Sequence, residues 1–252
     1  MTKHSEQFDD KLFLPNITLV AVDTTADIEA TSMAIKYSCR DIVFGRVLLI
    51  SNYNPNPNSK EYDFIKINAF KNISEWCEFI VFELFKFIDT DFIILIHADG
   101  FIVNPNKWTN NFLNYDYIGS PWPLYKHPIS FRDSNGNVCR VGNSVSLRSK
   151  KILEMPTKLN LKWENFVLNF PHEDGYLCAQ HKVLLESNGI KFAPLEVAIH
   201  FGRELPIPEN RGISPFLFHK WKGENKYFPN FTNQKIHTKF LKFIKKFFLR
   251  LI

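Results

Sequence analysis

Cysteine is scarce in this chain of 252 residues: there are four, and they form neither a CxxC pair nor a regular series of spacings. Such cysteines, here Cys39, Cys77, Cys139 and Cys178, are typical of the reduced and buried thiols of an intracellular protein. No apolar run reaches the about 20 residues that a membrane-spanning helix needs. Residues 1–13 also lack the apolar region of a signal peptide, so we expect a cytoplasmic protein.

Acidic residues are absent from residues 235–252, whose cations are Lys235, Lys239, Lys242, Lys245, Lys246 and Arg250. Subtracting these six cations from the net charge of +5 leaves −1 for the rest of the chain. A nearly neutral body argues against a nucleic-acid-binding domain, whose cations should lie across a folded face. The basic character therefore belongs to the C-terminal segment.

Apolar side chains recur at helical spacing in residues 239–252, and basic side chains occupy the other faces. The apolar ones are Phe240, Phe243, Ile244, Phe247, Phe248 and Leu251. A basic amphipathic helix of this kind commonly lies on an anionic membrane surface. We expect peripheral attachment to the inner face of a membrane, with packing on the protein's own body or on a partner as the alternative.

Strand patterns alternate with a helical pattern along the first part of the chain. Ile17–Asp23 and Arg46–Ser51 are typical strands, and Ala26–Tyr37 between them is typical of a helix. Strand, helix and strand at this spacing predict a βαβ unit and hence a parallel sheet. The length suits one domain, and we find no internal repeat. The expected fold class is α/β, with a mixed, mostly parallel sheet flanked by helices.

The second half of the chain carries shorter elements. Ser149 is expected to start a helix that Pro156 ends, because proline cannot continue it. Tyr176–Asn188 is expected to be helical, and Phe192–Ile199 is expected to hold one or two short strands. The chain is therefore divided into an N-terminal extension at 1–16, one domain at 17–234 and the basic tail at 235–252.

Asp99 follows an apolar run, Phe92–Ile96, that predicts a strand buried on both faces. In open α/β sheets, ligands lie at the carboxyl ends of such strands, so a carboxylate there points into the expected crevice. The alternative is that Asp99-Gly100 is an ordinary turn, which this dipeptide often forms. Acidic and histidine-containing motifs elsewhere favour the functional interpretation.

Carboxylates and histidines recur in three places: His97-x-Asp99, Glu173-Asp174, and a later histidine that is His200 or His219. Oxygen ligands suit Mg²⁺ and Mn²⁺, and Mn²⁺ also tolerates a nitrogen. Such an ion can neutralise a departing diphosphate, while Asp174 is placed to take the proton of an attacking hydroxyl. The alternative for the acidic pair is that the helix dipole alone favours acids in a first turn.

Five short motifs follow one another along the chain. They are HADGFIVNPNKW (97–108), YDYIGSPW (115–122), VGNSVSLRS (141–149), HEDGYLC (172–178) and FLFH (216–219). Together they resemble the GT-A glycosyltransferases, and most closely a group of sugar transferases described as a domain of unknown function. The resemblance spans roughly residues 17–222, and several motifs in order are much more specific than any one of them.

This resemblance implies a glycosyltransferase with a GT-A-like fold. The donor would be a nucleotide-diphosphate sugar, with UDP favoured, and the acceptor a hydroxyl of a glycan or of a lipid-linked or envelope saccharide. The transfer would be inverting and assisted by Mn²⁺ or Mg²⁺. The implied metal ligands are Asp99, at the second carboxylate of a DxD motif, His97, where the first would stand, and His219, with His200 as its rival.

The resemblance also implies roles for other residues. The donor nucleotide or sugar would be held by Asp23, Thr24, His97, Asp99, Gly142 and Asn143. The acceptor would be contacted by Trp122, Ser146 and Glu173, with Asp174 as the base and Glu173 beside it in the catalytic pair. An active enzyme is not the only possibility: a membrane-attached module that binds glycans or nucleotide sugars without turnover would explain the altered DxD motif. A nucleotidyltransferase would need a Gly-rich, basic loop after the first strand, and Val22–Ala26 has none.

Overall fold

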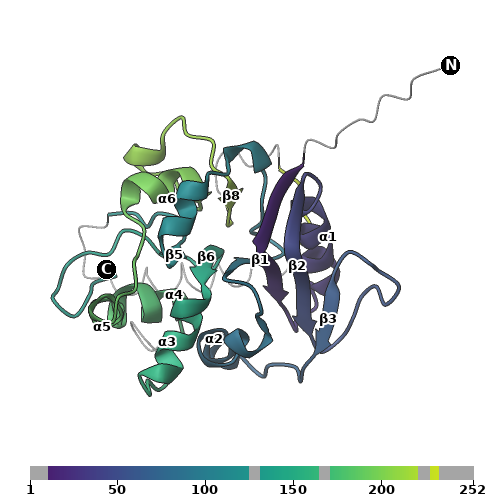
Figure 1. Ribbon diagram of the computed structural model, residues 1–252, viewed down its shortest axis with the longest axis horizontal. Helices are drawn as coiled ribbons and strands as arrows, with labels where there is room; N and C mark the ends of the chain where they lie inside the picture. The colour runs from purple at the N-terminus through teal and green to yellow at the C-terminus, as the bar shows by residue number, and fades with distance from the viewer. Residues whose placement is uncertain (1–10, 125–130, 165–170, 221–227, 233–252) are drawn as a thin grey trace, which may run out of the picture.

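A sheet of six strands forms the centre of the computed structural model, which describes residues 11–124, 131–164, 171–220 and 228–232 (Figure 1). The strands are β1 (Leu12–Val22), β2 (Ile42–Ser51), β3 (Asp63–Lys66), β4 (Phe92–Ile96), β5 (Tyr117–Ile118) and β6 (Ser146–Ser149). Their order in the sheet is β3-β2-β1-β4-β6-β5. The first four strands pair in parallel, and β6 runs antiparallel to both β4 and β5. The predicted α/β class with a mixed, mostly parallel sheet is confirmed.

The reversal at β6 brings distant segments to the carboxyl ends of the parallel strands β1 and β4, a region called the sheet edge below. Because Leu95 near the end of β4 lies opposite Ser146 at the start of β6, the segment before Ser146 meets the segment after Ile96. The end of β1 lies at the same edge, since Ala21 pairs with Ile96. Ligand sites of α/β sheets lie at such an edge, where the strand order changes direction.

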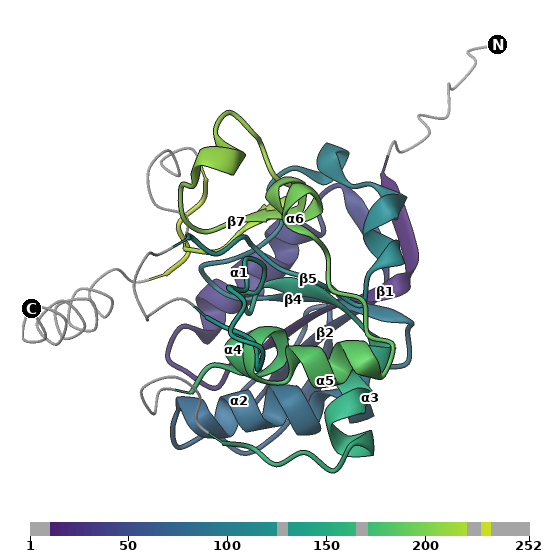
Figure 2. The same ribbon diagram turned by 90° about the vertical axis from the view of Figure 1, so that its left-hand side faces the viewer.

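Helices cover both faces of the sheet (Figure 2). Successive residues of β1 alternate between the two sides: Val20 packs with α2 (Ile73–Phe82) and α3 (Lys150–Lys158), whereas Leu19 packs with α1 (Ile28–Ser38) and α6 (Leu195–Phe201). A third core lies around α4 (Glu173–Gly175), the π-helical turn Tyr176–Gln180 and α5 (Lys182–Ser187). The central strands are thus covered on both sides, as their continuous apolar runs predict.

A second, two-stranded sheet pairs β7 (Gly202–Arg203) with β8 (Leu217–Phe218) in parallel. Leu217 also bridges to Ile102, and the Phe218 amide donates to the Phe101 carbonyl at 3.2 Å. The late FLFH segment is therefore fixed beside the chain that leaves β4. Short 3₁₀ turns at Leu84–Phe87, Pro105–Lys107, Asn110–Asn114 and Pro208–Asn210 complete the regular structure of the described residues.

Three predictions about local structure are wrong. β1 begins at Leu12 instead of Ile17, because a register irregularity between Leu14 and Thr18 accommodates Pro15 within the strand. Helix α3 continues through Pro156 to Lys158, with the proline buried in its last turn. The predicted strands at 192–199 are largely helix α6, which starts after Pro194 and buries Ala198 and Phe201.

The basic tail at 235–252 lies outside the described residues, so its predicted amphipathic helix stays a prediction. Among the helices that the structure describes, none combines the length and apolar character needed to cross a membrane.

Candidate functional site

The predicted metal ligands His97, Asp99 and His219 form one cluster at the sheet edge. Each offers a ligand atom, and these atoms all lie within 4.8 Å of one another. His97 and Gly100 exchange backbone hydrogen bonds of 2.7 and 3.2 Å, so Asp99 does sit in a tight turn. The turn carries its side chain toward His219, whose Nε2 is 3.6 Å from Asp99 Oδ1. The turn interpretation of Asp99-Gly100 is therefore correct, and the functional interpretation stays a prediction.

Gly100 explains how His219 comes so close to this turn. A Cβ at position 100 would lie 2.8 Å from His219 Cδ2 and 3.0 Å from the Phe218 carbonyl. The Lys220 amide donates to the Asp99 carbonyl at 2.8 Å and fixes the two segments together. His200, the rival ligand, lies exposed near the end of α6 and is not part of the cluster.

The cluster has the chemistry of a cation site. His97 Nε2 is buried and has no hydrogen-bond partner among the described residues, an arrangement that costs free energy unless an acceptor or a cation occupies it. Burial also lowers the pKa of His97, although Asp99 opposes this effect. The imidazole is thus kept neutral, as a metal ligand must be. Two imidazoles and one carboxylate fit a divalent ion that accepts nitrogen ligands.

Asp174 lies at the start of α4, nearly buried, with 13% of its side chain exposed. Its Oδ2 accepts the Asn143 amide at 3.0 Å, and its Oδ1 accepts the Gly175 amide at 2.8 Å. Burial raises the pKa of Asp174, the hydrogen bond from Gly175 opposes this, and the charge of Glu204 adds to it. A buried carboxylate of raised pKa with a little exposed surface is the arrangement expected of a general base.

Glu173 has a different environment from the one that the sequence predicts. Its Oε1 accepts Arg148 Nη2 at 2.7 Å, and both side chains are almost completely buried. Its Oε2 accepts Ser144 Oγ at 3.1 Å and also the Asp174 amide. The predicted contact of Glu173 with an acceptor is therefore not supported, because its side chain is only 2% exposed.

Arg148 and Glu204 were missed at the level of sequence. The Arg148 guanidinium also donates to Ser146 Oγ at 2.9 Å and to the Ser144 carbonyl at 3.2 Å. Its only sequence signal is a cation inside the apolar strand segment 145–149. Glu204 follows β7 in a loop rich in glycine and proline, where no periodicity marks it.

Two residues expected to contact the acceptor are packed inside the protein. Ser146 is fully buried, and its hydroxyl donates to the Ser144 carbonyl at 2.8 Å. Trp122 is 7% exposed, and its ring stacks on Phe131 with centroids 4.2 Å apart. A Cβ on Gly142 would lie 1.9 Å from the Trp122 ring, so this indole packs directly against the backbone before Asn143. Both residues shape the site without an exposed surface for a substrate.

The residues predicted to hold the nucleotide are at the same sheet edge. Asp23 accepts the Thr25 amide at 2.7 Å and Thr31 Oγ1 at 2.5 Å, which fixes the start of α1. Thr24 Oγ1 accepts the Phe70 amide at 3.1 Å. Both remain partly exposed. Trp76 joins this end of β1 to the cluster, since its Nε1 donates to the Val22 carbonyl at 2.9 Å and its ring meets that of His97 edge-on.

A family of proteins of unknown function, DUF5672, matches residues 59–219, well over half of the chain. This chain belongs to the DUF5672 family. The matched region includes all five motifs and ends at His219, the last residue of the cluster. No curated protein matches the sequence.

Solved structures with distant similarity to this DUF5672 protein include two glycosyltransferase-related chains and one synthase. The apo-form glycosyltransferase GlyE of Streptococcus pneumoniae TIGR4 has a TM-score of 0.43 at 12% identity, over 86% of this chain and 57% of GlyE. An active-site mutant of LgtC has a TM-score of 0.45 at 12% identity, covering 82% and 87% of the two chains. The 4-diphosphocytidyl-2C-methyl-D-erythritol synthase of Anaerococcus prevotii DSM 20548 has a TM-score of 0.40 at 10% identity, covering 75% and 89%. Similarity of this degree assigns no activity.

Replacing Gly119 by alanine should destabilise this DUF5672 fold, because Gly119 permits the close approach of two motifs. A Cβ there would lie 1.6 Å from the Gly142 carbonyl oxygen, so one backbone segment must move. We expect the free energy of unfolding to fall by about 1–3 kcal/mol, as for other overpacked sites. Urea denaturation measures the change. Gly136→Asn is the control, since a Cβ at Gly136 meets nothing within 4 Å and asparagine tolerates its positive φ; equal midpoints for both variants would contradict the expectation.

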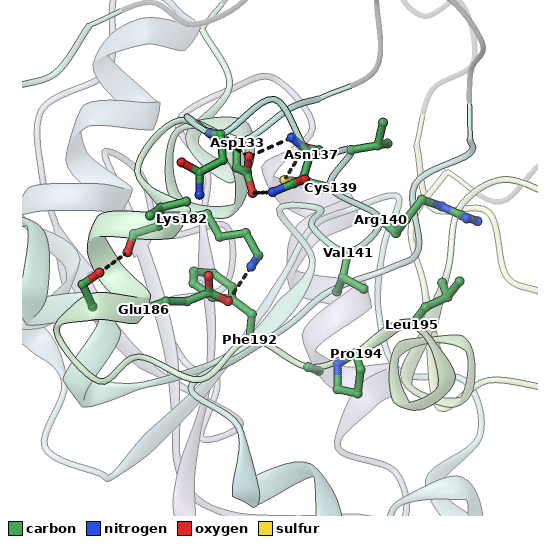
Figure 3. A pocket seen from close by; sticks show the side chains of 15 residues that line it. Asp133, Asn137, Cys139, Arg140, Val141, Lys182, Glu186, Phe192, Pro194 and Leu195 are labelled. Atoms are coloured by element: carbon green, nitrogen blue, oxygen red, sulfur yellow. Dashed lines mark hydrogen bonds and ion pairs between the residues drawn. The ribbon is translucent and has the colours of Figure 1, made fainter.

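A separate groove of about 750 Å³ lies between the hairpin 131–141, α5 and the segment before α6 (Figure 3). Asp133, Arg140, Lys182 and Glu186 supply its charged lining, and Phe192 and Leu195 supply apolar surface. None of the predicted catalytic or metal-binding residues lines it. The candidate site of this DUF5672 protein is therefore at the sheet edge and not in this groove.

Proposed function

We propose that this DUF5672 protein is a glycosyltransferase that moves a sugar from a nucleotide-diphosphate sugar to a hydroxyl acceptor, with inversion. One observation carries the proposal: the cluster of two histidines and one carboxylate and the buried carboxylate of Asp174 occur at one edge of the sheet, joined through a short series of contacts. His219 Nδ1 lies 3.9 Å from Glu204 Oε1, Glu204 Oε2 accepts Asn143 Nδ2 at 2.7 Å, and the Asn143 amide donates to Asp174. These contacts link the segments near positions 99, 174 and 219.

The cluster would hold the cation through His97, Asp99 and His219. A divalent ion bound there supplies Lewis-acid stabilisation of the negative charge that develops on the diphosphate as it leaves. The donor set favours Mn²⁺ over Mg²⁺, because two of the three ligands are nitrogen and Mg²⁺ prefers oxygen. Asp23 and Thr24, at the neighbouring end of β1, are proposed to contact the nucleotide.

Asp174 is proposed to be the general base. It takes the proton from the acceptor hydroxyl as that oxygen bonds to the anomeric carbon, and the bond from that carbon to the diphosphate oxygen breaks. The raised pKa of Asp174 makes it a stronger proton acceptor than an exposed aspartate. The hydrogen bonds from Asn143 and Gly175 hold the carboxylate in one orientation. Glu173 is assigned to positioning, since its oxygens bind Arg148 and Ser144.

The tail at 235–252 is proposed to hold the enzyme at an anionic membrane surface in the cytoplasm, near lipid-linked or envelope saccharide acceptors. The charge pattern of the sequence supports this part of the proposal. Binding of the full chain to anionic vesicles, and its loss when residues 235–252 are deleted, would test the tail separately from catalysis.

Replacing Asp99 by asparagine tests the proposed function directly. The variant removes the only carboxylate among the three cluster residues, so the affinity for Mn²⁺ should fall by more than about 100-fold and donor hydrolysis should stop. The assay incubates the protein with UDP-, GDP- and CMP-sugars plus Mn²⁺ and measures free nucleotide. Asp133→Asn, in the separate groove, is the control. A wild-type protein that binds nucleotide sugars but never releases nucleotide would instead indicate a binding module.

A further inference from the structure

Glu204 lies between the two halves of the proposed site, and the pairing of β7 with β8 places it there. Arg203 pairs with Phe218, so the residues that follow them, Glu204 and His219, emerge side by side. The His219 amide donates to the Arg203 carbonyl at 3.0 Å and fixes this register. Glu204 is partly buried, with 26% of its side chain exposed.

One oxygen of Glu204 faces the histidine of the cluster. The two ring nitrogens of His219 have carboxylates on opposite sides: Nε2 is 3.6 Å from Asp99 Oδ1, and Nδ1 is 3.9 Å from Glu204 Oε1. A histidine that binds a metal through one nitrogen usually donates its other N–H to a carboxylate, which sets the tautomer and the ring orientation. Glu204 occupies the position of that carboxylate, at an ion-pair separation of 3.9 Å.

The other oxygen of Glu204 fixes the segment that holds the proposed base. Asn143 has a φ of 92°, in the left-handed region that residues other than glycine adopt only at a cost in conformational free energy. Glu204 Oε2 accepts its Nδ2 at 2.7 Å, and Asn143 Oδ1 accepts the Val145 amide at 3.1 Å. These bonds hold the strained residue so that its own amide reaches Asp174.

We infer that Glu204 is a positioning residue that orients His219 for a divalent cation and, through Asn143, fixes the carboxylate of Asp174. The inference rests on the proposed function and adds to it a single carboxylate that couples cation binding to the geometry of the base. It assigns Glu204 no contact with the reacting atoms.

The test measures Mn²⁺ binding to the full-length protein by calorimetry, without donor or acceptor. Glu204→Gln should raise the Kd for Mn²⁺ by about 10–100-fold, the usual loss when the carboxylate behind a ligating histidine is removed. Glu204→Asp keeps the charge on a shorter side chain and should recover part of this loss. Glu209→Gln is the control: Glu209 belongs to the same loop and pairs with Arg140 at 2.9 Å, away from the cluster. Thermal midpoints of all variants verify folding, and the amide oxygen that Glu204→Gln retains can still accept the hydrogen bond from Asn143.

The outcomes separate this inference from the proposed function. If Glu204→Gln binds Mn²⁺ as tightly as the wild type while Asp99→Asn does not, the positioning role is overturned and the transferase proposal stands. If the wild type itself takes up no Mn²⁺, both the positioning role and metal-assisted transfer are overturned. A selective loss of affinity in Glu204→Gln, with the Glu209→Gln value unchanged, supports the positioning role.

Discussion

Sugar transfer by the Asp174→Asn variant should be slower than transfer by the wild type by roughly 10²–10⁴-fold, the usual contribution of a positioned general base. The substitution changes one oxygen to an amide nitrogen, so the side chain keeps its size but can no longer accept a proton. One amide oxygen remains to accept from Asn143 or Gly175, so the local fold should be retained. Initial rates with saturating donor and acceptor measure the loss, and donor affinity should be unchanged because Asp174 is not assigned to the nucleotide.

The pH dependence of the proposed transfer by the wild-type protein provides a second measurement of the same role. Because burial raises the pKa of Asp174, the acid limb of kcat/KM should lie above about 4, the value of an unperturbed aspartate. Activity should rise as pH increases through this pKa, since only the ionised carboxylate accepts a proton. Residual activity of Asp174→Asn should lack this limb. A variant with a wild-type rate, or with the same acid limb, would show that another group is the base.

Replacing Arg148 by methionine should lower the free energy of unfolding by about 3–5 kcal/mol, because it leaves Glu173 buried without its cation. Burial opposes the charge on Arg148, but Tyr117 and Glu173 raise its pKa above the ordinary value. Burial and the charge of Asp174 raise the pKa of Glu173, and Arg148 opposes this, so Glu173 depends on Arg148 to stay ionised. Urea denaturation followed by tryptophan fluorescence and by circular dichroism measures the change. The two probes should agree if unfolding is two-state.

A double variant distinguishes a buried ion pair from general disruption of the core. Arg148→Met combined with Glu173→Gln removes both charges, so it should be less destabilised than the sum of the two single variants. Lys36→Met is the matched control, since it breaks an exposed pair with Glu61 and should leave the midpoint unchanged. Additive losses in the double variant would mean that Arg148 and Glu173 are not energetically coupled.

The sequence predicts those residues of the site that stand next to a recognisable local pattern, such as a buried strand or a helix start. Asp99 follows a continuous apolar run that stops abruptly, and both the buried strand and the carboxylate at its end follow from that pattern. Glu173-Asp174 is marked by two acids at a helix start. Which of the two acids is buried against a cation depends on Arg148, 25 positions earlier, and no local pattern shows this.

The remaining features depend on contacts between distant segments. Glu204 reaches His219 because two pairs of residues, 15 positions apart, form a short parallel ladder. Trp122 lies in a proline-flanked motif that would look the same in the sequence whether the ring stacks on a sugar or on another side chain. The structure shows that it stacks on Phe131. Pro156 is tolerated because it occupies the last turn of α3 and is buried there, a tertiary effect that outweighs its helix propensity.

The close backbone contact between Gly119 and Gly142 has a consequence for the segment between them. Gly119 and Gly142 lie at the two ends of the segment that contains the hairpin 131–141. Their contact, together with the bridge between Pro121 and Val141, holds these two ends together. We therefore expect that lengthening the hairpin would not displace Asn143 or Arg148. The geometry of the residues at the sheet edge would then be independent of the sequence of this segment.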